Sequence, residues 1–181
     1  MAEPRSQRPK KTEPLMTKQD VKYHLSLAGE FFVAAELQRR GVSAAVTYGN
    51  AKKADVVAFS TTGEKAVVIE VKSTSQPKWV VGSVTPPPSS KLWVFVYLPS
   101  DESEAASYYV LFQSELHEIL SPMDEEFRMR FKAKHGEEYG NRRGVVNFSR
   151  NEAERRGLKN RWDKIIGQLA IPESRFHRSP L

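Results

Sequence analysis

Two acidic residues and a lysine, carried by neighbouring strand-like segments, are the side chains of this sequence best placed to do chemistry. Asp55 lies at the start of the apolar segment 54–60, and Glu70 and Lys72 lie near the end of the apolar segment 65–73. A short turn separates the two segments, which is typical of an antiparallel β-hairpin. The sequence therefore predicts that all three side chains belong to one hairpin.

The expected register of this hairpin brings the three side chains together. If the turn is centred between Thr62 and Gly63, Asp55 lies directly opposite Glu70. Opposed residues of an antiparallel pair point to the same face, with Cβ atoms roughly 4.5–5.5 Å apart. Lys72, two residues beyond Glu70, shares that face. The prediction requires a regular pairing, since one bulge would break the register.

Phosphodiester hydrolysis is the chemistry that these residue types favour. The other hairpin residues are almost all apolar, so we expect both faces to be buried, where charges are costly unless they are paired or hold a metal ion. Mg²⁺ takes oxygen ligands, usually one or two carboxylates with waters and substrate phosphate. We expect Asp55 and Glu70 to bind Mg²⁺, or Mn²⁺ in its place, assisted by the carbonyl oxygen of Val71. Lys72 would orient or deprotonate the attacking water, or stabilise charge that develops on the phosphate.

Four further residues are predicted to support this chemistry. Glu30 interrupts an apolar stripe of a predicted helix, so it needs a polar partner, and a position beside the metal ion would supply one. Lys52 and Lys53 immediately precede Asp55, and Ser73 follows the predicted catalytic lysine. We expect these last three residues to contact DNA.

The elements that must position these residues form a mixed α/β domain. A helix is predicted over 17–40, because Thr17 can cap it, apolar residues recur at three- and four-residue steps, and Gly41 follows a basic last turn. Strands are predicted over 43–48, 54–60, 65–73, 92–98 and 108–112, with short strand-like runs at 79–81 and 145–148. Further helices are predicted after a cap at Ser114, over 125–135 and over 160–169. This order indicates an α/β (α+β) fold with a mixed central sheet rather than a Rossmann fold.

The arrangement of Gly29-Glu30, Asp55 and Glu70-Val71-Lys72 resembles the PD-(D/E)XK nuclease superfamily. More narrowly, the chain resembles a group of small, uncharacterised prokaryotic members of it in the run 70–74, Trp79, the segments 92–98 and 108–112, and the late run 160–162. The superfamily resemblance covers residues 20–112. It implies a restriction-endonuclease-like core of helix, three strands, helix and strand. It also implies metal ligation by Asp55 and Glu70, catalysis by Lys72 and support from Glu30.

The sequence departs from that superfamily at two places. Ala54 stands where the motif name has a proline, at a position that the superfamily varies. The stretch between Lys72 and Leu92 is rich in proline and does not have a helical pattern, so the sequence does not predict the crossover helix that is usual in the superfamily. The second departure concerns how the sheet closes, and it leaves the predicted hairpin unaffected.

Composition is typical of one globular domain. The chain has 181 residues, of which 39% are hydrophobic and 28% charged, and it has no cysteine. We expect a single domain over 19–171, a disordered basic arm over 1–18 and a tail over 172–181. The lack of cysteine excludes disulfides, a thiolate zinc site and a cysteine nucleophile. No apolar run approaches the roughly 18–20 residues that cross a bilayer, so we expect no membrane association and a cytoplasmic location.

The charge favours a polyanionic partner, since the net charge is +6 and the isoelectric point is about 9.5. The first hypothesis is therefore a Mg²⁺-dependent DNA endonuclease that acts by water attack in restriction, repair or defence. A homodimer would suit the cutting of two strands by two sites.

Other interpretations stay open. Asp55, Glu70 and Lys72 would also suit a structural ion-pair cluster. The basic residues after Arg128 alternate with glutamates, which favours ordinary solvated helix faces over a phosphate-binding surface. A non-catalytic nucleic-acid-binding or scaffold module on the same fold, and an unrelated α+β enzyme with another metal chemistry, are the two rival functions.

Overall fold

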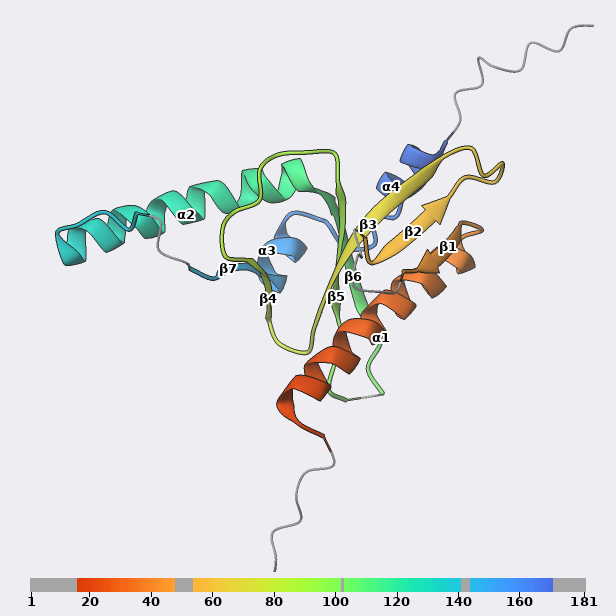
Figure 1. The fold of residues 1–181 in the computed structure, drawn as a ribbon, viewed down its shortest axis with the longest axis horizontal. Helices are drawn as coiled ribbons and strands as arrows, with labels where there is room; N and C mark the ends of the chain where they lie inside the picture. The colour runs from red at the N-terminus through yellow and green to blue at the C-terminus, as the bar shows by residue number, and fades with distance from the viewer. Residues whose placement is uncertain (1–15, 48–53, 102, 141–143, 171–181) are drawn as a thin grey trace, which may run out of the picture.

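The computed structural model describes residues 16–47, 54–101, 103–140 and 144–170, and it shows a mixed α/β fold (Figure 1). The described elements are, in chain order, α1 (Lys18–Arg39), β1 (Ser43–Val46), β2 (Val56–Phe59), β3 (Ala66–Thr74), β4 (Lys78–Gly82), β5 (Leu92–Tyr97), β6 (Ser107–Phe112), α2 (Gln113–His135), β7 (Val146–Ser149), α3 (Arg150–Arg155) and α4 (Asp163–Leu169). The predicted arm and tail lie almost wholly outside the described residues.

Helix α1 begins and ends as the sequence predicts. The Thr17 hydroxyl accepts a hydrogen bond from the Asp20 amide at 3.1 Å, and the Asp20 carboxylate accepts from the Thr17 amide at 3.0 Å, which completes a capping box. At the other end Gly41 has a φ of 75°, a left-handed conformation that glycine adopts without steric cost. The face of α1 that carries Val33 and Leu37 is buried against the sheet.

The central sheet has five strands in the order β1-β2-β3-β5-β6. Strands β1, β2 and β3 form an antiparallel meander, β3 and β5 are parallel, and β5 and β6 are antiparallel. The predicted mixed sheet is therefore confirmed. The outer edge of β6 is covered by a later segment, because the Val110 amide donates to the Leu158 carbonyl at 3.0 Å and the Asn160 amide donates to the Tyr108 carbonyl at 2.8 Å.

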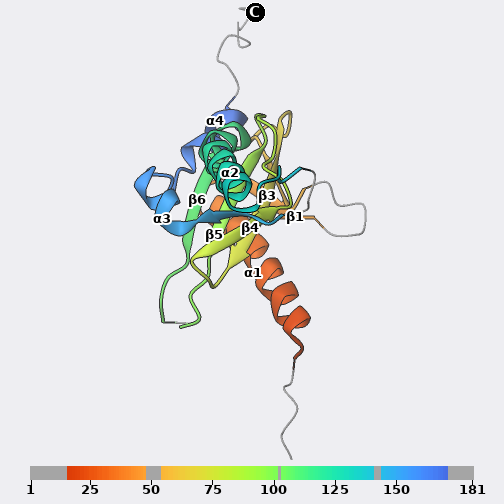
Figure 2. The ribbon, with the colours of Figure 1, turned by 90° about the vertical axis from the view of Figure 1, so that its left-hand side faces the viewer.

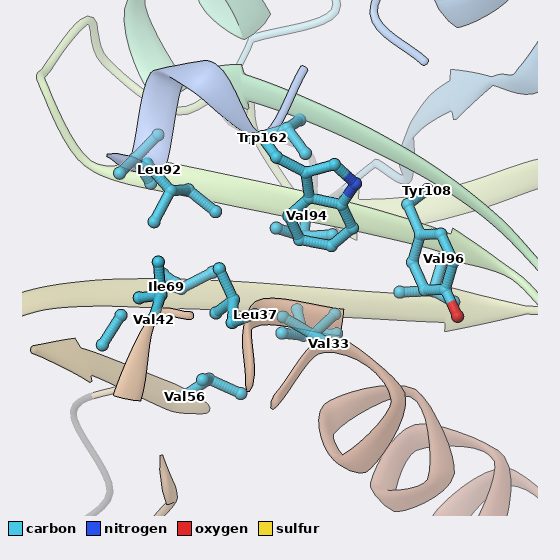
Figure 3. Packing of buried hydrophobic residues seen from close by; sticks show 14 of the residues in the cluster. Val33, Leu37, Val42, Val56, Ile69, Leu92, Val94, Val96, Tyr108 and Trp162 are labelled. Carbon is cyan, nitrogen blue, oxygen red and sulfur yellow. The ribbon is translucent and has the colours of Figure 1, made fainter. Parts of the chain in front are cut away.

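Different elements cover the two faces of this sheet (Figures 1 and 2). Helices α1 and α4 pack on one face, where Val33 and Leu37 meet Ile69, Val94 and other aliphatic side chains (Figure 3). On the opposite face, α2, α3 and the small β4–β7 sheet pack over β5 and β6. The described part of the layer on this second face leaves Phe59 of β2 and Val68 of β3 exposed.

No helix connects β3 to β5; the connection, described throughout, contains strand β4 instead. The crossover helix usual in the superfamily is therefore absent from this connection. Three consecutive prolines follow β4 and disfavour a helix there. Strand β4 pairs with β7 in a separate two-stranded sheet. Trp79 fixes this sheet to the central one, because its buried indole nitrogen donates to the Val96 carbonyl at 2.9 Å.

The C-terminal helices differ from the sequence prediction in three ways. The two helices expected after Ser114 are one helix, α2, which continues through Pro122 and starts directly after β6 with no side-chain cap. The helix α3 was not predicted; Ser149 caps it by accepting from the Glu152 amide at 3.2 Å. The last helix starts at Asp163 rather than at Asn160, because Asn160 has a φ of 56° and cannot belong to a right-handed helix.

Candidate active site

The β2–β3 hairpin has the predicted register. Val56 pairs with Ile69 and Phe59 with Ala66, and the Ser60 amide donates to the Lys65 carbonyl at 2.9 Å next to the turn. In this register Asp55 and Glu70 would be the next pair, but the regular pairing ends at Val56 and Ile69, so the predicted pair of Asp55 with Glu70 is not part of the ladder. The hairpin therefore carries the candidate carboxylates to one end, as the sequence indicates.

At that end the regular backbone pairing stops, and the Asp55 side chain, instead of a backbone carbonyl, accepts a hydrogen bond from strand β3. The Asp55 amide donates to the Ile69 carbonyl at 3.0 Å, and Oδ2 of Asp55 accepts from the amide of Val71 at 2.7 Å. Strand β3 runs on beyond this point without β2 beside it. Asp55 is thus fixed one peptide unit from Glu70, at the place where the two strands separate.

Glu70 is held by two ammonium groups. Its Oε1 lies 3.1 Å from Nζ of Lys72, and its Oε2 lies 2.7 Å from Nζ of Lys91. Burial alone would raise the pKa of Glu70, but the hydrogen bonds and charges of Lys91 and Lys72 outweigh this effect and lower the pKa below its ordinary value. Glu70 is therefore a carboxylate that the surrounding protein keeps ionised.

Lys91 is a site residue that sequence reasoning did not find. It directly precedes β5, whose parallel pairing with β3 sets Glu70 opposite Trp93. Because alternate strand residues share a face, Lys91 lies on the same face as Trp93 and Glu70. The Nζ atoms of Lys91 and Lys72 lie 5.6 and 5.7 Å from the centroid of the Trp93 ring. The only sequence signal was a lysine at the start of an apolar strand, and the strand pairing was needed to interpret it.

The backbone around Lys91 is fixed by the start of α2. The Lys91 carbonyl accepts from the Gln113 amide at 2.8 Å, and the Gln113 side chain donates to the Pro87 carbonyl at 2.6 Å. Oε1 of the same buried glutamine accepts from the Trp93 indole at 3.1 Å. Gln113 therefore ties together the proline-rich connection, β5 and α2 at the position where Lys91 reaches Glu70.

The face of the hairpin that carries Glu70 and Lys72 is open, and the expectation that both faces are buried was wrong. Phe59 is 37% exposed and Val68 is 47% exposed on this face, whereas Val56 and Ile69 are fully buried on the face toward α1. The physical reason is that the second layer, as far as the described residues show it, leaves the part of this face around Phe59 and Val68 uncovered. A ligand can therefore approach Glu70 and Lys72 from solvent.

The other predicted site residues have different surroundings. Glu30 is only 4% exposed, on the sheet-facing side of α1. Ser73 lies under the same helix, where a Cβ added to Gly29 would be 1.7 Å from its Oγ, and this oxygen is buried without a hydrogen-bond partner among the described residues. Contact of Ser73 with DNA does not fit this position. Lys52 and Lys53 lie outside the described residues.

The donors near the hairpin end fit a hard divalent cation in type. They are the carboxylates of Asp55 and Glu70, and two carboxylates are what Mg²⁺ commonly takes. The Val71 carbonyl is directed to the side of Asp55, because the N–H and C=O groups of one strand residue point the same way. Among the described residues no group of three or more acidic or histidine side chains forms a ready metal cage. The remaining ligands would be waters and substrate oxygens.

A groove lies on another part of the described chain. It has a volume of about 370 Å³ and lies between α2 and the β4–β7 sheet, with Lys78, Phe127, Arg128 and Tyr139 among its lining residues. None of the predicted catalytic residues lines it. The candidate site is therefore separate from this groove.

Comparison of the chain with protein-family models, with curated proteins and with solved structures gave no match. None of the described helices is both long and apolar enough to pass through a lipid bilayer.

Proposed function

We propose that this protein is a metal-dependent DNA endonuclease of the PD-(D/E)XK type, with Asp55, Glu70 and Lys72 at its centre. The observation that carries the proposal is the anchoring of the Asp55 carboxylate on the Val71 amide, one peptide unit from the Glu70–Lys72 ion pair. This arrangement lies at an open strand end, where a phosphodiester of a long polymer has access.

Each residue has a role that follows from its contacts. Asp55, Glu70 and the Val71 carbonyl would hold Mg²⁺ or Mn²⁺, which supplies a water of lowered pKa and offsets phosphate charge when bound. Lys72 lies in an ion pair with Glu70 and would orient the attacking water or stabilise charge on the phosphate. Glu30 is kept as the supporting residue that the sequence predicts; it is buried on the sheet-facing side of α1, which packs on the face opposite to the Glu70 and Lys72 side chains, so no direct contact with those two side chains is proposed.

A second candidate function is a DNA-binding module without catalysis. The observation in its favour is that both oxygens of Glu70 are already in ion pairs with lysines, as in a purely structural cluster. In that case the net charge of +6 would provide binding, and binding would weaken steeply as salt rises.

The decisive experiment is nicking of supercoiled plasmid DNA in the presence of Mg²⁺ or Mn²⁺. We expect Asp55→Asn and Lys72→Met to lower the nicking rate by about a hundredfold or more. Asparagine retains an oxygen that can accept the hydrogen bond from the Val71 amide, so that Asp55→Asn tests the charge rather than the fold.

The matched control is Asp101→Asn, which removes a carboxylate from an exposed loop. Its nicking rate should equal that of the wild-type protein. Equal nicking by all variants would overturn the proposal. Salt-sensitive DNA binding without metal-dependent nicking would establish the second candidate function instead.

Three further expectations belong to this proposal: DNA as the partner, the cytoplasm as the location, and a homodimer that cuts both strands. Sedimentation analysis with and without duplex DNA measures the subunit number directly. A linear product that forms without a nicked intermediate would support paired active sites.

A further inference from the structure

Lys91 is a charged residue in the described part of the candidate site, and the proposed function does not yet account for it. Of the two ion pairs that described residues make with Glu70, the Lys91 pair is the shorter, at 2.7 Å, and it uses the oxygen that Lys72 does not contact. Its side chain is 32% exposed, and it directly precedes β5, whereas the other site residues belong to the β2–β3 hairpin. It is therefore positioned independently of the hairpin.

Charge balance gives this ion pair a consequence for metal binding. Asp55, Glu70 and Lys72 together carry one net negative charge, which attracts a divalent cation. Lys91 cancels that charge, so that the four side chains together are neutral. A carboxylate that is neutralised in this way has a lower affinity for a second cation.

Geometry leads to the same conclusion. The Lys91 ammonium nitrogen lies 2.7 Å from Oε2 of Glu70. A cation coordinated by the same oxygen would lie about 2 Å from it. Both charges at one oxygen would be roughly 4 Å apart and would repel strongly. Lys91 and the metal ion therefore compete for the same oxygen.

We propose that, in the metal-free protein, the Lys91 ammonium occupies Oε2 of Glu70, and that it must move away from this oxygen before a divalent cation can bind there. This inference rests on the proposed function, since it concerns the same site. The Lys91 ammonium stabilises the partly buried Glu70 carboxylate in the metal-free protein, and it sets the cation concentration at which the site fills. Lys72, on the other oxygen, stays with Glu70 in both states.

The test is calorimetric titration of Mn²⁺ into the metal-free protein, which needs no DNA and no activity. Lys91→Met should bind Mn²⁺ about tenfold more tightly than the wild-type protein, since one positive charge is removed from the site. Lys78→Met removes the same charge from an exposed position on β4 and should leave the affinity unchanged. Lys91→Gln, which keeps a hydrogen-bond donor for Glu70, is the substitute if Lys91→Met does not fold.

Thermal unfolding provides a second readout. Without metal, Lys91→Met should melt below the wild-type protein, because Glu70 loses one of its two cationic partners. Saturating Mn²⁺ should raise the melting temperature of Lys91→Met more than that of the wild-type protein. A purely structural lysine would lower the melting temperature equally with and without metal.

The outcomes separate this inference from the proposed function. Unchanged or weaker Mn²⁺ binding by Lys91→Met, with binding still abolished in Glu70→Gln, overturns the role of Lys91 and leaves the metal site standing. Undiminished Mn²⁺ binding in Glu70→Gln and Asp55→Asn overturns the proposed metal site itself. If Lys91→Met binds Mn²⁺ at concentrations where the wild-type protein binds none, the result supports both the role of Lys91 and the proposed metal site.

Discussion

At the scale of single residues, the environment of a side chain decides its protonation state. Tyr108 lies at 7% exposure on β6, with its ring 5.4 Å from that of Trp162. Burial raises the pKa of Tyr108 to about 12, and the negative charge of Glu36 adds to the rise. The folded protein therefore keeps this phenol neutral at a pH where the unfolded chain would ionise it.

This pKa predicts a specific loss of stability in alkali. The contribution of Tyr108 is fully present below the unfolded pKa of about 10 and is lost as the pH rises through the folded pKa of about 12. Tyr108→Phe should match the wild-type stability at pH 7 and exceed it by about 2 kcal/mol near pH 12. Urea unfolding at several pH values measures the difference. A constant difference at all pH values would contradict the prediction, and Tyr23→Phe, at an exposed position, is the control.

Much of the candidate site could be predicted from the sequence because it depends on local pairing. The hairpin turn fixes the register near Asp55 and Glu70, and two-residue periodicity adds Lys72. Lys91 could not be predicted, because its contact with Glu70 depends on which strand pairs with β3 across a long connection. The open face was also missed, since apolar residues such as Phe59 and Val68 favour burial in the sequence, although no layer built from the described residues covers them.

At the scale of elements, close contact between α1 and β3 depends on a residue without a side chain. A Cβ at Gly29 would lie 1.7 Å from Oγ and 2.8 Å from Cβ of Ser73. Rotation of the serine hydroxyl can relieve the first overlap, whereas the second involves an atom fixed to the backbone of β3. Gly29 therefore sets how closely the helix approaches the sheet.

Gly29→Ala should destabilise the protein by roughly 1–3 kcal/mol, although alanine ordinarily stabilises a helix relative to glycine. In a Ser73→Gly background the same substitution should be neutral or stabilising, because both overlapping atoms are gone. Chemical denaturation of the four proteins of this cycle measures the coupling. Gly167→Ala, at a helical position with open space around it, should be stabilising by about 1 kcal/mol. Equal effects of the two alanine substitutions would show that the contact is absent.

Elements with local signals were predicted well and those set by tertiary contacts were not. Helix α1 has its own cap and stop residues, and its predicted limits agree with the structure within a residue. Helix α2 has no side-chain cap and contains Pro122, so its start and its continuity depend on the attachment of its first turn to β5 and the proline-rich connection. The start of α4 depends on one left-handed residue, Asn160, which periodicity does not detect.

At the scale of the whole molecule, two tryptophans mark the two sides of the central sheet. Trp79 packs against Phe95, Tyr109 and Phe148 on one side, and its indole nitrogen bonds to the Val96 carbonyl. Trp162 lies on the other side, and its indole nitrogen is buried without a hydrogen-bond partner in the described part of the chain. The two residues thus offer matched substitutions that differ in one hydrogen bond.

Trp79→Phe should destabilise the protein by about 2 kcal/mol or more, because it removes buried volume and a buried hydrogen bond. Trp162→Phe should have a smaller effect, since no such bond is lost. Hydrogen exchange should show the largest loss of protection in β4 and β7 for Trp79→Phe, and in α4 for Trp162→Phe. Uniform loss across the sheet in both variants would mean that the two layers are not separately anchored.

The pairing of β4 with β7 joins segments that are synthesised far apart in time. While the chain emerges from the ribosome, Lys78–Gly82 is complete long before Val146–Ser149 exists, and its backbone N–H and C=O groups then have no strand beside them. A nascent chain, or a fragment that stops within α2, would expose Trp79 together with this unpaired edge. Such species are prone to aggregate, so the yield of folded protein should depend on how soon the last quarter of the chain is translated.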